Sequence, residues 1–413
     1  MKRTNLENWI GKTESIPRLN RKALEDLQLK RLNETLTRLK ARGGFYKDYP
    51  EKLGSLSDLQ TLPFTTAEAL SSHPGKFLLT SQSEVSRVIS GATSGTTGPA
   101  KRVFYSEIDT EHTVGFFAAG ISEMLSPGEK CFIAFPFSGS FGLGDLIAKA
   151  VERLGGIPVR AGFGMTWGEM LNLIKDTQPQ TYIGFPVTLL SAARMYGEHF
   201  PIKRALVSGD ACPAGVMEEL EMCLGSKLYP HYGSRECGLG GAVTCSAFEG
   251  MHLRENHIIP EIIDENGNVL PDGQYGELVI TTIGLHAMPL IRYRTGDHTR
   301  ILPPCPCGGI TKRIDTVSRR EGNISIEELD SALFSIGGLV DYRASFDGRL
   351  TIEARTLCAG LETEICSKAK ELYPDLQISV YSSRCTHADR PVYLGKRHVV
   401  QISDSVMCST VSG

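Results

Sequence analysis

Hydrophobic residues recur at helical spacing near the start of the chain. Residues 21–42 carry leucines among charged side chains at intervals of mostly three to five residues: Leu24, Leu27, Leu32, Leu36 and Leu39. This spacing is typical of an α-helix with one buried face, and the Gly43-Gly44 pair that follows is typical of a helix end. The pattern predicts an amphipathic helix over residues 21–42.

Strand-like and helix-like segments alternate through the middle of the chain. Short apolar stretches stand at "KCFIAFPF", "IPVRAG", "TYIGFP" and "KRALVSGD". Segments with helical periodicity lie between or after them: "DLIAKAVERLGG", "WGEMLNLIKDTQ" and "VMEELEMCLGSK". Strands that alternate with helices of this length form βαβ units, so we expect a parallel sheet.

The texture of the sequence changes after about residue 250. "HIIPEIIDENGNVL", which contains an Asn-Gly turn, "GELVITTI" and "PLIRYRTGD" predict a β-rich subdomain. From about residue 318 onward, the helical segments "SIEELDSALFSI" and "LETEICSKAKELY" lie between short strands. The expected fold class is α/β. We expect a large amino-terminal domain over residues 1–317, with parallel or mixed sheets and the β-rich subdomain, and a small α+β domain over residues 318–413.

Composition narrows the classes of partner. Of the 413 residues 41% are hydrophobic and 22% are charged, and the net charge is −3. This near balance gives no electrostatic reason to expect nucleic acid or an anionic membrane as a partner. No apolar run approaches the roughly 20 residues that span a bilayer, and "MKRTNLENWIGK" lacks the apolar core of a signal peptide. We therefore expect a cytoplasmic protein whose eleven cysteines are free thiols or metal ligands.

The stretch "SGATSGTTGPAKR", residues 90–102, has the chemistry of a phosphate-binding loop. Its glycines let backbone N–H groups face an anion, its hydroxyls donate hydrogen bonds, and its lysine adds a positive charge. It lacks the G-K-[ST] end of a P-loop, and a surface Gly/Thr turn has the same composition. The candidate phosphate ligands are Thr93, Ser94, Gly95, Thr96, Thr97, Gly98 and Lys101.

Three further glycine-containing loops follow predicted strands, where ligands bind in open α/β sheets. They are "VSGDACP", "HYGSRE" and "YRTGD", and their candidate ligands are Ser208, Gly209, Asp210, Tyr232, Gly233, Glu236 and Asp297. The Asp210 carboxylate suits a base or a hydroxyl, although a solvated turn uses aspartate in the same way. Tyr232 offers a ring for stacking, and the Asp297 carboxylate suits a ribose diol.

In this order and spacing, "TSGTTGPAK", "YGSRE" and "YRTGD" resemble the core motifs of the adenylate-forming superfamily of acyl-CoA synthetases and adenylation domains. "LPFTTAEAL" and the long segment from "MHLREN" to "YRTGD" resemble its phenylacetate–CoA ligase branch. The resemblance runs from about Leu53 to about Ser318 and, more weakly, to Lys396. It implies that a carboxylate attacks the α-phosphate of Mg·ATP, giving an acyl-adenylate and pyrophosphate, and that a thiol then captures the acyl group.

The resemblance also implies roles for individual residues. Glu236 would hold Mg²⁺, Tyr232 would stack on adenine, and Asp297 would bind the ribose hydroxyls. Arg319, in "TVSRREG", would contact ribose or phosphate near the hinge to a mobile carboxy-terminal domain. Lys396, in "YLGKRHVV", would reach the reacting carboxylate and the α-phosphate, although an exposed lysine after a glycine is also commonplace.

Cysteines and a histidine form a second candidate site. "CPCGG" and, upstream, "CSAFEGMH" supply Cys245, His252, Cys305 and Cys307, which make a complete tetrahedral set for a structural zinc ion. Some relatives in the branch look as if they carry such a cluster. Buried free cysteines are the alternative, and His257 is a rival ligand or an active-site residue.

Two departures from the family leave the last step of the reaction open. Arg235 stands in "YGSRE" where a Thr or Ser binds the α-phosphate, so it either supplies charge as a catalytic residue or points away. The hinge segment looks shortened, which supports adenylation better than thioester formation. The acceptor is therefore CoA, a protein thiol, a carrier or an amine. A nucleotide-binding regulatory protein is the alternative to an enzyme.

The expected substrate is a small carboxylic acid. Its pocket is expected along "FPFSGSFGLG" and "GFPVTLL". Phe135, Phe137, Phe141 and Phe185 in these stretches suit an aromatic or apolar acid, but phenylalanines are equally ordinary core residues. A dimer is a candidate assembly.

Overall fold

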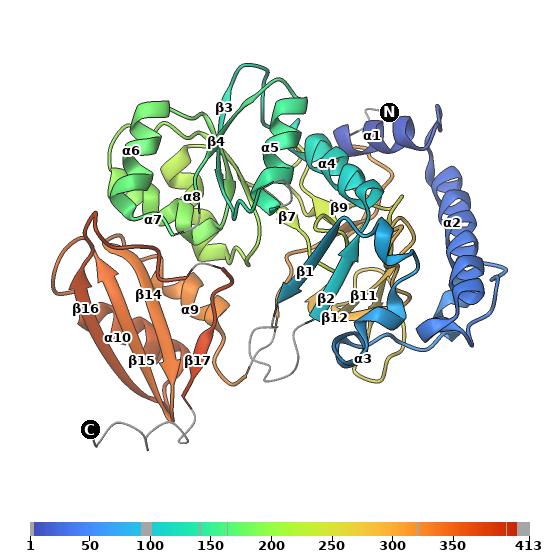
Figure 1. The fold of residues 1–413 in the computed structure, drawn as a ribbon. Coiled ribbons are helices and arrows are strands. Elements are labelled where there is room, and N and C mark those ends of the chain that lie inside the picture. The colour runs from blue at the N-terminus through green and yellow to red at the C-terminus, as the bar shows by residue number, and fades with distance from the viewer. Residues whose placement is uncertain are drawn as a thin grey trace. The chain divides into compact units, whose positions relative to one another are not determined.

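The computed structural model describes residues 4–91, 101–139, 142–162, 164–319, 322–393 and 395–402. The chain forms two compact units (Figure 1). The first unit comprises residues 1–128, 138–156 and 229–320, and the second comprises residues 129–137, 157–228 and 321–413. Each unit combines helices with sheets, which confirms the predicted α/β class.

Two helices open the first unit. They are α1 (Asn5–Thr13) and α2 (Arg21–Arg42), and the second confirms the helix predicted from the leucine spacing. The side chain of Asn20 caps the first turn of α2, and Gly43 ends the helix with a φ of 78°, a conformation that glycine adopts without strain. The buried face of α2 is made by Leu24, Gln28, Leu32, Thr35, Leu36 and Leu39.

Antiparallel strands make up most of the remaining first unit. One sheet has the order β10 (Ile258–Ile263), β11 (Gly276–Thr282) and β12 (Tyr293–Thr299). A second group of paired strands has the order β13 (Arg313–Ile314), β9 (Met251–Leu253), β8 (Ala242–Val243) and β7 (Tyr229–Tyr232). The strands β1 (Arg87–Gly91) and β2 (Lys101–Tyr105) pair antiparallel. The strands β9 to β13 confirm the β-rich subdomain predicted after residue 250.

Helices complete the first unit. The α-helices are α3 (Ala67–Ser72), α4 (Glu107–Ile121) and α5 (Leu143–Arg153). The 3₁₀-helices are η1 (Gly44–Tyr46), η2 (Leu56–Thr61), η3 (Pro74–Phe77) and η4 (Gln82–Glu84). Apolar residues of α2, β2 and the β10–β12 sheet share one buried core.

A parallel sheet lies in the second unit, as the alternating pattern predicts. Its strands have the order β6 (Arg204–Val207), β5 (Thr181–Gly184), β3 (Lys130–Ala134) and β4 (Ile157–Arg160). The helices of this part are α6 (Trp167–Thr177), α7 (Pro186–Tyr196) and α8 (Ala214–Leu224).

The carboxy-terminal segment forms the rest of the second unit. Its sheet has the order β16 (Gln377–Arg384), β15 (Arg349–Thr356), β14 (Leu339–Phe346) and β17 (Val399–Gln401). The accompanying helices are α9 (Ile326–Leu333) and α10 (Glu362–Leu372), and α10 lies against the sheet (Figure 1).

One apolar core is shared between this segment and α7 and α8. Ser191 of α7 donates a hydrogen bond to the carbonyl oxygen of Val340, and Arg194 donates to that of Leu339. Residues 321–413 are thus grouped with 157–228 in one unit. The division of the chain after residue 317 and the mobility of the last segment stay predictions.

In the described part of the chain, no helix combines the length and the apolar character needed to cross a membrane. The cytoplasmic location and the dimer stay predictions.

We expect Gly215→Ala to destabilise the second unit. A Cβ on Gly215 would lie 2.0 Å from the carbonyl oxygen of Ser331, so α8 and α9 must move apart. The expected cost is about 1–3 kcal/mol of unfolding free energy, measured by urea denaturation. Gly337→Ala is the matched control, because a Cβ there meets no atom within 4 Å. Equal stability of the two variants would contradict this close approach.

Candidate functional site

A buried ion pair connects three distant stretches of the first unit. The ammonium of Lys101, the first residue of β2, lies 2.5 Å from the Glu236 carboxylate, which follows β7. The hydroxyl of Tyr293, the first residue of β12, accepts from Lys101 at 2.9 Å and donates to Glu236 at 3.2 Å. Lys101 and Glu236 are each only 5% exposed. Burial alone would raise the pKa of Glu236, but the neighbouring ammonium outweighs it and holds that pKa below its ordinary value.

A second group of predicted nucleotide ligands lies together in the same unit. The hydroxyl of Tyr232 donates to the Asp297 carboxylate at 2.8 Å, and the guanidinium of Arg319 lies 3.5 Å from that carboxylate. Arg319 also donates to the carbonyl oxygen of Thr295 at 2.8 Å. An aromatic ring, a buried carboxylate and a cation from three separate motifs therefore meet at one place.

The "YGSRE" turn between these groups is tightly packed. A Cβ on Gly233 would lie 2.2 Å from the carbonyl oxygen of Leu239, so only glycine fits there. The hydroxyl of Tyr105 donates to the carbonyl oxygen of Arg235, which fixes the backbone next to Glu236. Among the described residues the half-buried Arg235 guanidinium forms no ion pair, and its charge contributes to the lowered pKa of Glu236.

Ser208, Gly209 and Asp210 belong to the second unit. The two carboxylate oxygens of Asp210 accept the backbone N–H groups of Ala211 at 2.9 Å and of Arg397 at 2.8 Å. Burial raises the pKa of Asp210 to about 7, against the opposing effect of the Arg397 N–H group. The sequence pattern made Asp210 a candidate nucleotide ligand. Its carboxylate is instead hydrogen-bonded to the backbone of the segment that carries Lys396.

An aromatic pair lies beside Gly209. Phe135 and Phe185 pack edge to face with ring centres 5.0 Å apart. Gly209 has a φ of 84°, and a Cβ there would lie 2.7 Å from the Phe185 ring and 2.9 Å from the Phe135 ring. Phe141 lies outside the described residues.

Lys396 is exposed, and its neighbour Arg397 anchors the backbone. The Arg397 guanidinium is buried, donates to the Asp330 carboxylate at 3.0 Å and lies 2.7 Å from that of Asp341. Lys396 belongs to the second unit, whereas the two polar groups described above belong to the first. Thr93, Ser94, Gly95, Thr96, Thr97 and Gly98 lie outside the described residues.

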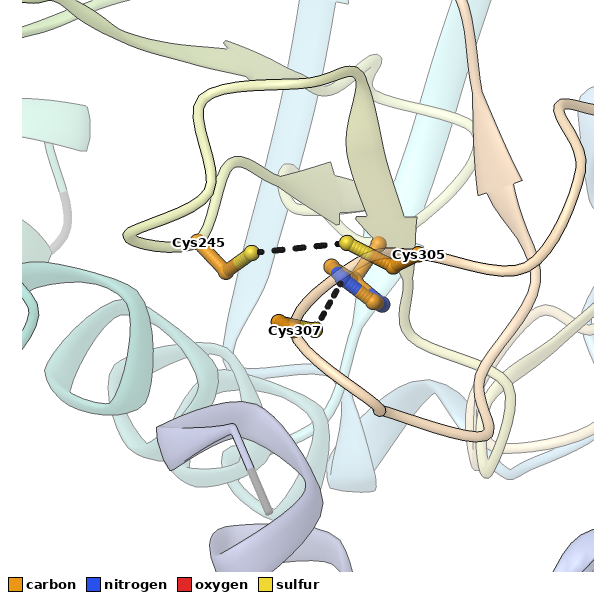
Figure 2. Close-up of side chains that lie close together, drawn as sticks. Cys245, Cys305 and Cys307 are labelled. Atoms are coloured by element: carbon orange, nitrogen blue, oxygen red, sulfur yellow. Dashed lines mark hydrogen bonds between the residues drawn. The ribbon is translucent and has the colours of Figure 1, made fainter. Parts of the chain in front are cut away.

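The predicted cysteines and histidine come together in the first unit. One ligand atom from each of Cys245, His252, Cys305 and Cys307 lies within 4.8 Å of the other three. The Cys245 and Cys305 sulfurs are 3.8 Å apart, and His252 Nε2 lies 3.5 Å from the Cys307 sulfur. Figure 2 shows the three cysteine side chains converging on one point. His257 is not part of this cluster.

These spacings match those of a tetrahedral metal site. Zinc bonds of about 2.3 Å to sulfur and about 2.0–2.1 Å to nitrogen place two sulfurs about 3.8 Å apart and a sulfur and a nitrogen about 3.5 Å apart. The N–H groups of Ala247 and Gly309 also point to the sulfurs of Cys245 and Cys307. The four residues fit zinc in ligand type, two of their spacings match a tetrahedral site, and all four ligand atoms lie within 4.8 Å of one another.

Sequence reasoning missed several residues that shape these sites. Tyr293 stood in the quoted "YRTGD" motif, so its position could have indicated a role. Arg397 directly follows Lys396 in the quoted "YLGKRHVV" stretch, so its position could also have indicated a role. Thr311 contacts His252, and Glu7 contacts Thr311. No sequence signal indicated this pair, because some 300 residues separate Glu7 from Thr311.

Comparison with known proteins agrees with this geometry. The family described as "AMP-binding enzyme" matches residues 92–288. A phenylacetate-coenzyme A ligase of Thermus thermophilus is 31% identical over 76% of this chain and 73% of its own. That of Aromatoleum evansii is 33% identical over 71% and 70%.

Solved structures show the same fold. A 2-hydroxyisobutyryl-CoA ligase in the postadenylation state matches with a TM-score of 0.77 and 20% identity, over 92% of this chain and 90% of that one. The relatives at 31% and 33% identity show that the chain belongs to the adenylate-forming superfamily, in its phenylacetate–CoA ligase branch, and is an AMP-forming acid–thiol ligase.

We expect Lys101→Met to destabilise the first unit most strongly near neutral pH. In the wild type the lowered pKa of Glu236 contributes stability above the unfolded glutamate value of about 4.3, and this contribution is lost as the pH falls through the folded pKa. Without the ammonium, burial raises the pKa of Glu236, so its ionised form opposes folding. At pH 7 we expect the variant to lose about 3–5 kcal/mol of unfolding free energy relative to the wild type. This loss should become smaller below about pH 4.

Urea unfolding at a series of pH values measures the difference in unfolding free energy between the wild type and Lys101→Met. The double variant Lys101→Met/Glu236→Gln is the control, because it removes both charges and with them most of the pH dependence. A single variant with wild-type stability at every pH would show that the pair is not buried.

Proposed function

We propose that the protein activates a carboxylic acid with ATP as an acyl-adenylate, releases pyrophosphate, and transfers the acyl group to CoA. The observation that carries this proposal is the meeting of motif residues in the first unit, where Tyr232, Asp297 and Arg319 form one polar group and Lys101, Glu236 and Tyr293 form another. These groups supply a ring, a carboxylate and cations, which suit the base, the ribose and the phosphates of ATP.

The ion pair prepares two opposite charges for Mg·ATP. Glu236 stays ionised because the Lys101 ammonium lowers its pKa, so its carboxylate is ready to hold Mg²⁺. Lys101 and the residues Thr93–Gly98 would bind the phosphates. The ammonium of Lys101 would contact a phosphate oxygen of the bound nucleotide, and the Tyr293 hydroxyl would orient Lys101 and Glu236.

Chemistry occurs at the α-phosphate. An oxygen of the substrate carboxylate forms a bond to phosphorus while the bond to the leaving pyrophosphate breaks. Negative charge moves onto the bridging and leaving oxygens, so fixed cations lower the barrier. We assign this role to Arg235, which replaces a hydroxyl with a positive charge next to Glu236, and to Lys396.

The acid is proposed to be aromatic. Phe135 and Phe185 lie edge to face beside Gly209, where a side chain would collide with both rings. Phenyl rings favour such arrangements. The phenylacetate-coenzyme A ligases at 31% and 33% identity agree with this class of substrate.

The thiol cluster is proposed to bind one structural zinc ion. Four protein ligands complete a tetrahedral site and leave no position for water or substrate, so the metal would hold loops together and take no part in the reaction.

We expect acid-dependent release of pyrophosphate from Mg·ATP when the protein is tested with aryl, fatty and amino acids. Aryl acids should give the fastest release, and CoA should increase turnover because it removes the adenylate. Release that an amine or a carrier thiol accelerates, but CoA does not, would identify a different acceptor. ATP binding with no release for any acid would favour a regulatory protein.

We expect Lys396→Ala to lower the rate of adenylation by about 10²–10³-fold, because it removes a cation from the transition state. The dissociation constant for ATP, measured by calorimetry, should stay close to that of the wild type. Lys175→Ala, which removes an exposed lysine from α6 of the same unit, is the matched control. Equal rates for both variants would remove Lys396 from the mechanism.

A further inference from the structure

The first helix of the chain places a carboxylate against the thiol cluster. The hydroxyl of Thr4 caps α1 by accepting the N–H of Glu7, and Glu7 lies on the buried face of the helix with 1% exposure. One of its oxygens accepts the N–H groups of Ile310 at 2.5 Å and Thr311 at 2.9 Å, and the Thr311 hydroxyl at 3.1 Å. In the described part of the chain Glu7 forms no ion pair, so these three donors satisfy its charge.

The same hydroxyl contacts the histidine of the cluster. Thr311 Oγ1 lies 2.9 Å from His252 Nδ1, and His252 Nε2 faces the Cys307 sulfur. A carboxylate can only accept, so the single proton of the hydroxyl goes to Glu7. The hydroxyl oxygen must then accept a proton from Nδ1. This leaves Nε2 unprotonated and directed at the cluster, which is the tautomer that binds a metal.

A glycine allows the members of the Glu7–Thr311–His252 hydrogen-bond chain, called the relay below, to approach one another closely. A Cβ on Gly309 would lie 2.8 Å from the Glu7 carboxylate, 3.1 Å from the His252 ring and 3.2 Å from the Cys307 sulfur. The turn over residues 305–311 therefore supplies two thiol ligands, the bridging hydroxyl and the backbone donors to α1. A shift of this turn would therefore move two of the thiol ligands and the backbone groups that bind α1 at the same time.

We propose that Glu7 and Thr311 are positioning residues that hold His252 in its metal-binding tautomer, so that metal binding and the docking of α1 stabilise each other. The proposal rests on the zinc site proposed above. Partners of a histidine ligand typically contribute 10–100-fold to metal affinity. Because linkage is reciprocal, a metal that needs the docked arrangement must also favour it.

The experiment measures zinc affinity by competition with a chelator in the full chain. The wild type should bind one zinc ion. Thr311→Val, which keeps the shape of the side chain but removes the hydroxyl, should bind zinc about 10–100-fold more weakly. Thr311→Ser keeps the hydroxyl and should restore the affinity, and Glu7→Gln should fall between the two.

Limited trypsin digestion gives a second readout that does not depend on activity. Lys12 and Arg18 are exposed, and cleavage after them reports release of α1. Cleavage should be faster in metal-free protein and slow again when zinc is added. In Thr311→Val, the zinc concentration that protects should rise by the same factor as the dissociation constant.

Different results overturn different parts. A wild type that binds no zinc would refute the metal site itself. A wild type that binds zinc while Thr311→Val binds it equally tightly would refute the relay and leave the metal site standing. Reduced affinity in Thr311→Val with cleavage that zinc does not change would refute the coupling to α1.

Discussion

The candidate nucleotide site depends on two opposite charges that are buried side by side. Removing either Lys101 or Glu236 from water alone costs several kcal/mol, and only a close partner offsets that cost. Because the partners lie on β2 and after β7, the requirement fixes the relative position of these two stretches. Tyr293 adds the start of β12 to the same point through one hydroxyl that both accepts and donates. The ion pair therefore helps to fix the relative positions of these strands, in addition to backbone hydrogen bonding.

A buried cation has the same role in the second unit. Arg397 lies between the carboxylates of Asp330 and Asp341, and its backbone N–H reaches Asp210. Two carboxylates on the guanidinium and a third on the backbone N–H hold the short stretch that carries Lys396 against the end of the parallel sheet. This explains how an exposed lysine on a loop can have a defined backbone position. It also explains why the pKa of Asp210 rises to about 7, because burial outweighs the N–H groups that stabilise its charge.

Periodicity in the sequence predicts the elements well and the polar contacts poorly. The leucine spacing predicts α2 with its bounds, because apolar burial decides where that helix lies. It does not predict the buried Gln28, whose amide donates to the carbonyl oxygen of Glu255, more than two hundred residues away. Motifs predict that Tyr232 stacks on adenine and that Asp297 binds ribose, but the hydrogen bond between them exists only in the folded chain. The cysteine spacing likewise indicates a metal type, whereas the choice of His252 over His257 depends on which histidine the strands turn toward the thiols.

The short strands near the thiol cluster give a physical reason for a structural metal ion there. β8, β9 and β13 contain only two or three residues each, so few ladder hydrogen bonds hold this edge together. The turn over residues 303–311 is rich in proline, glycine and cysteine and contributes little apolar burial. A metal that links Cys245 to Cys305 would close a loop of about 60 residues, which restricts the unfolded chain by roughly 4 kcal/mol when treated as a covalent crosslink. The proposed metal would therefore add the stability that short strands and a turn with little apolar burial do not supply, and it would hold the residues that contact α1.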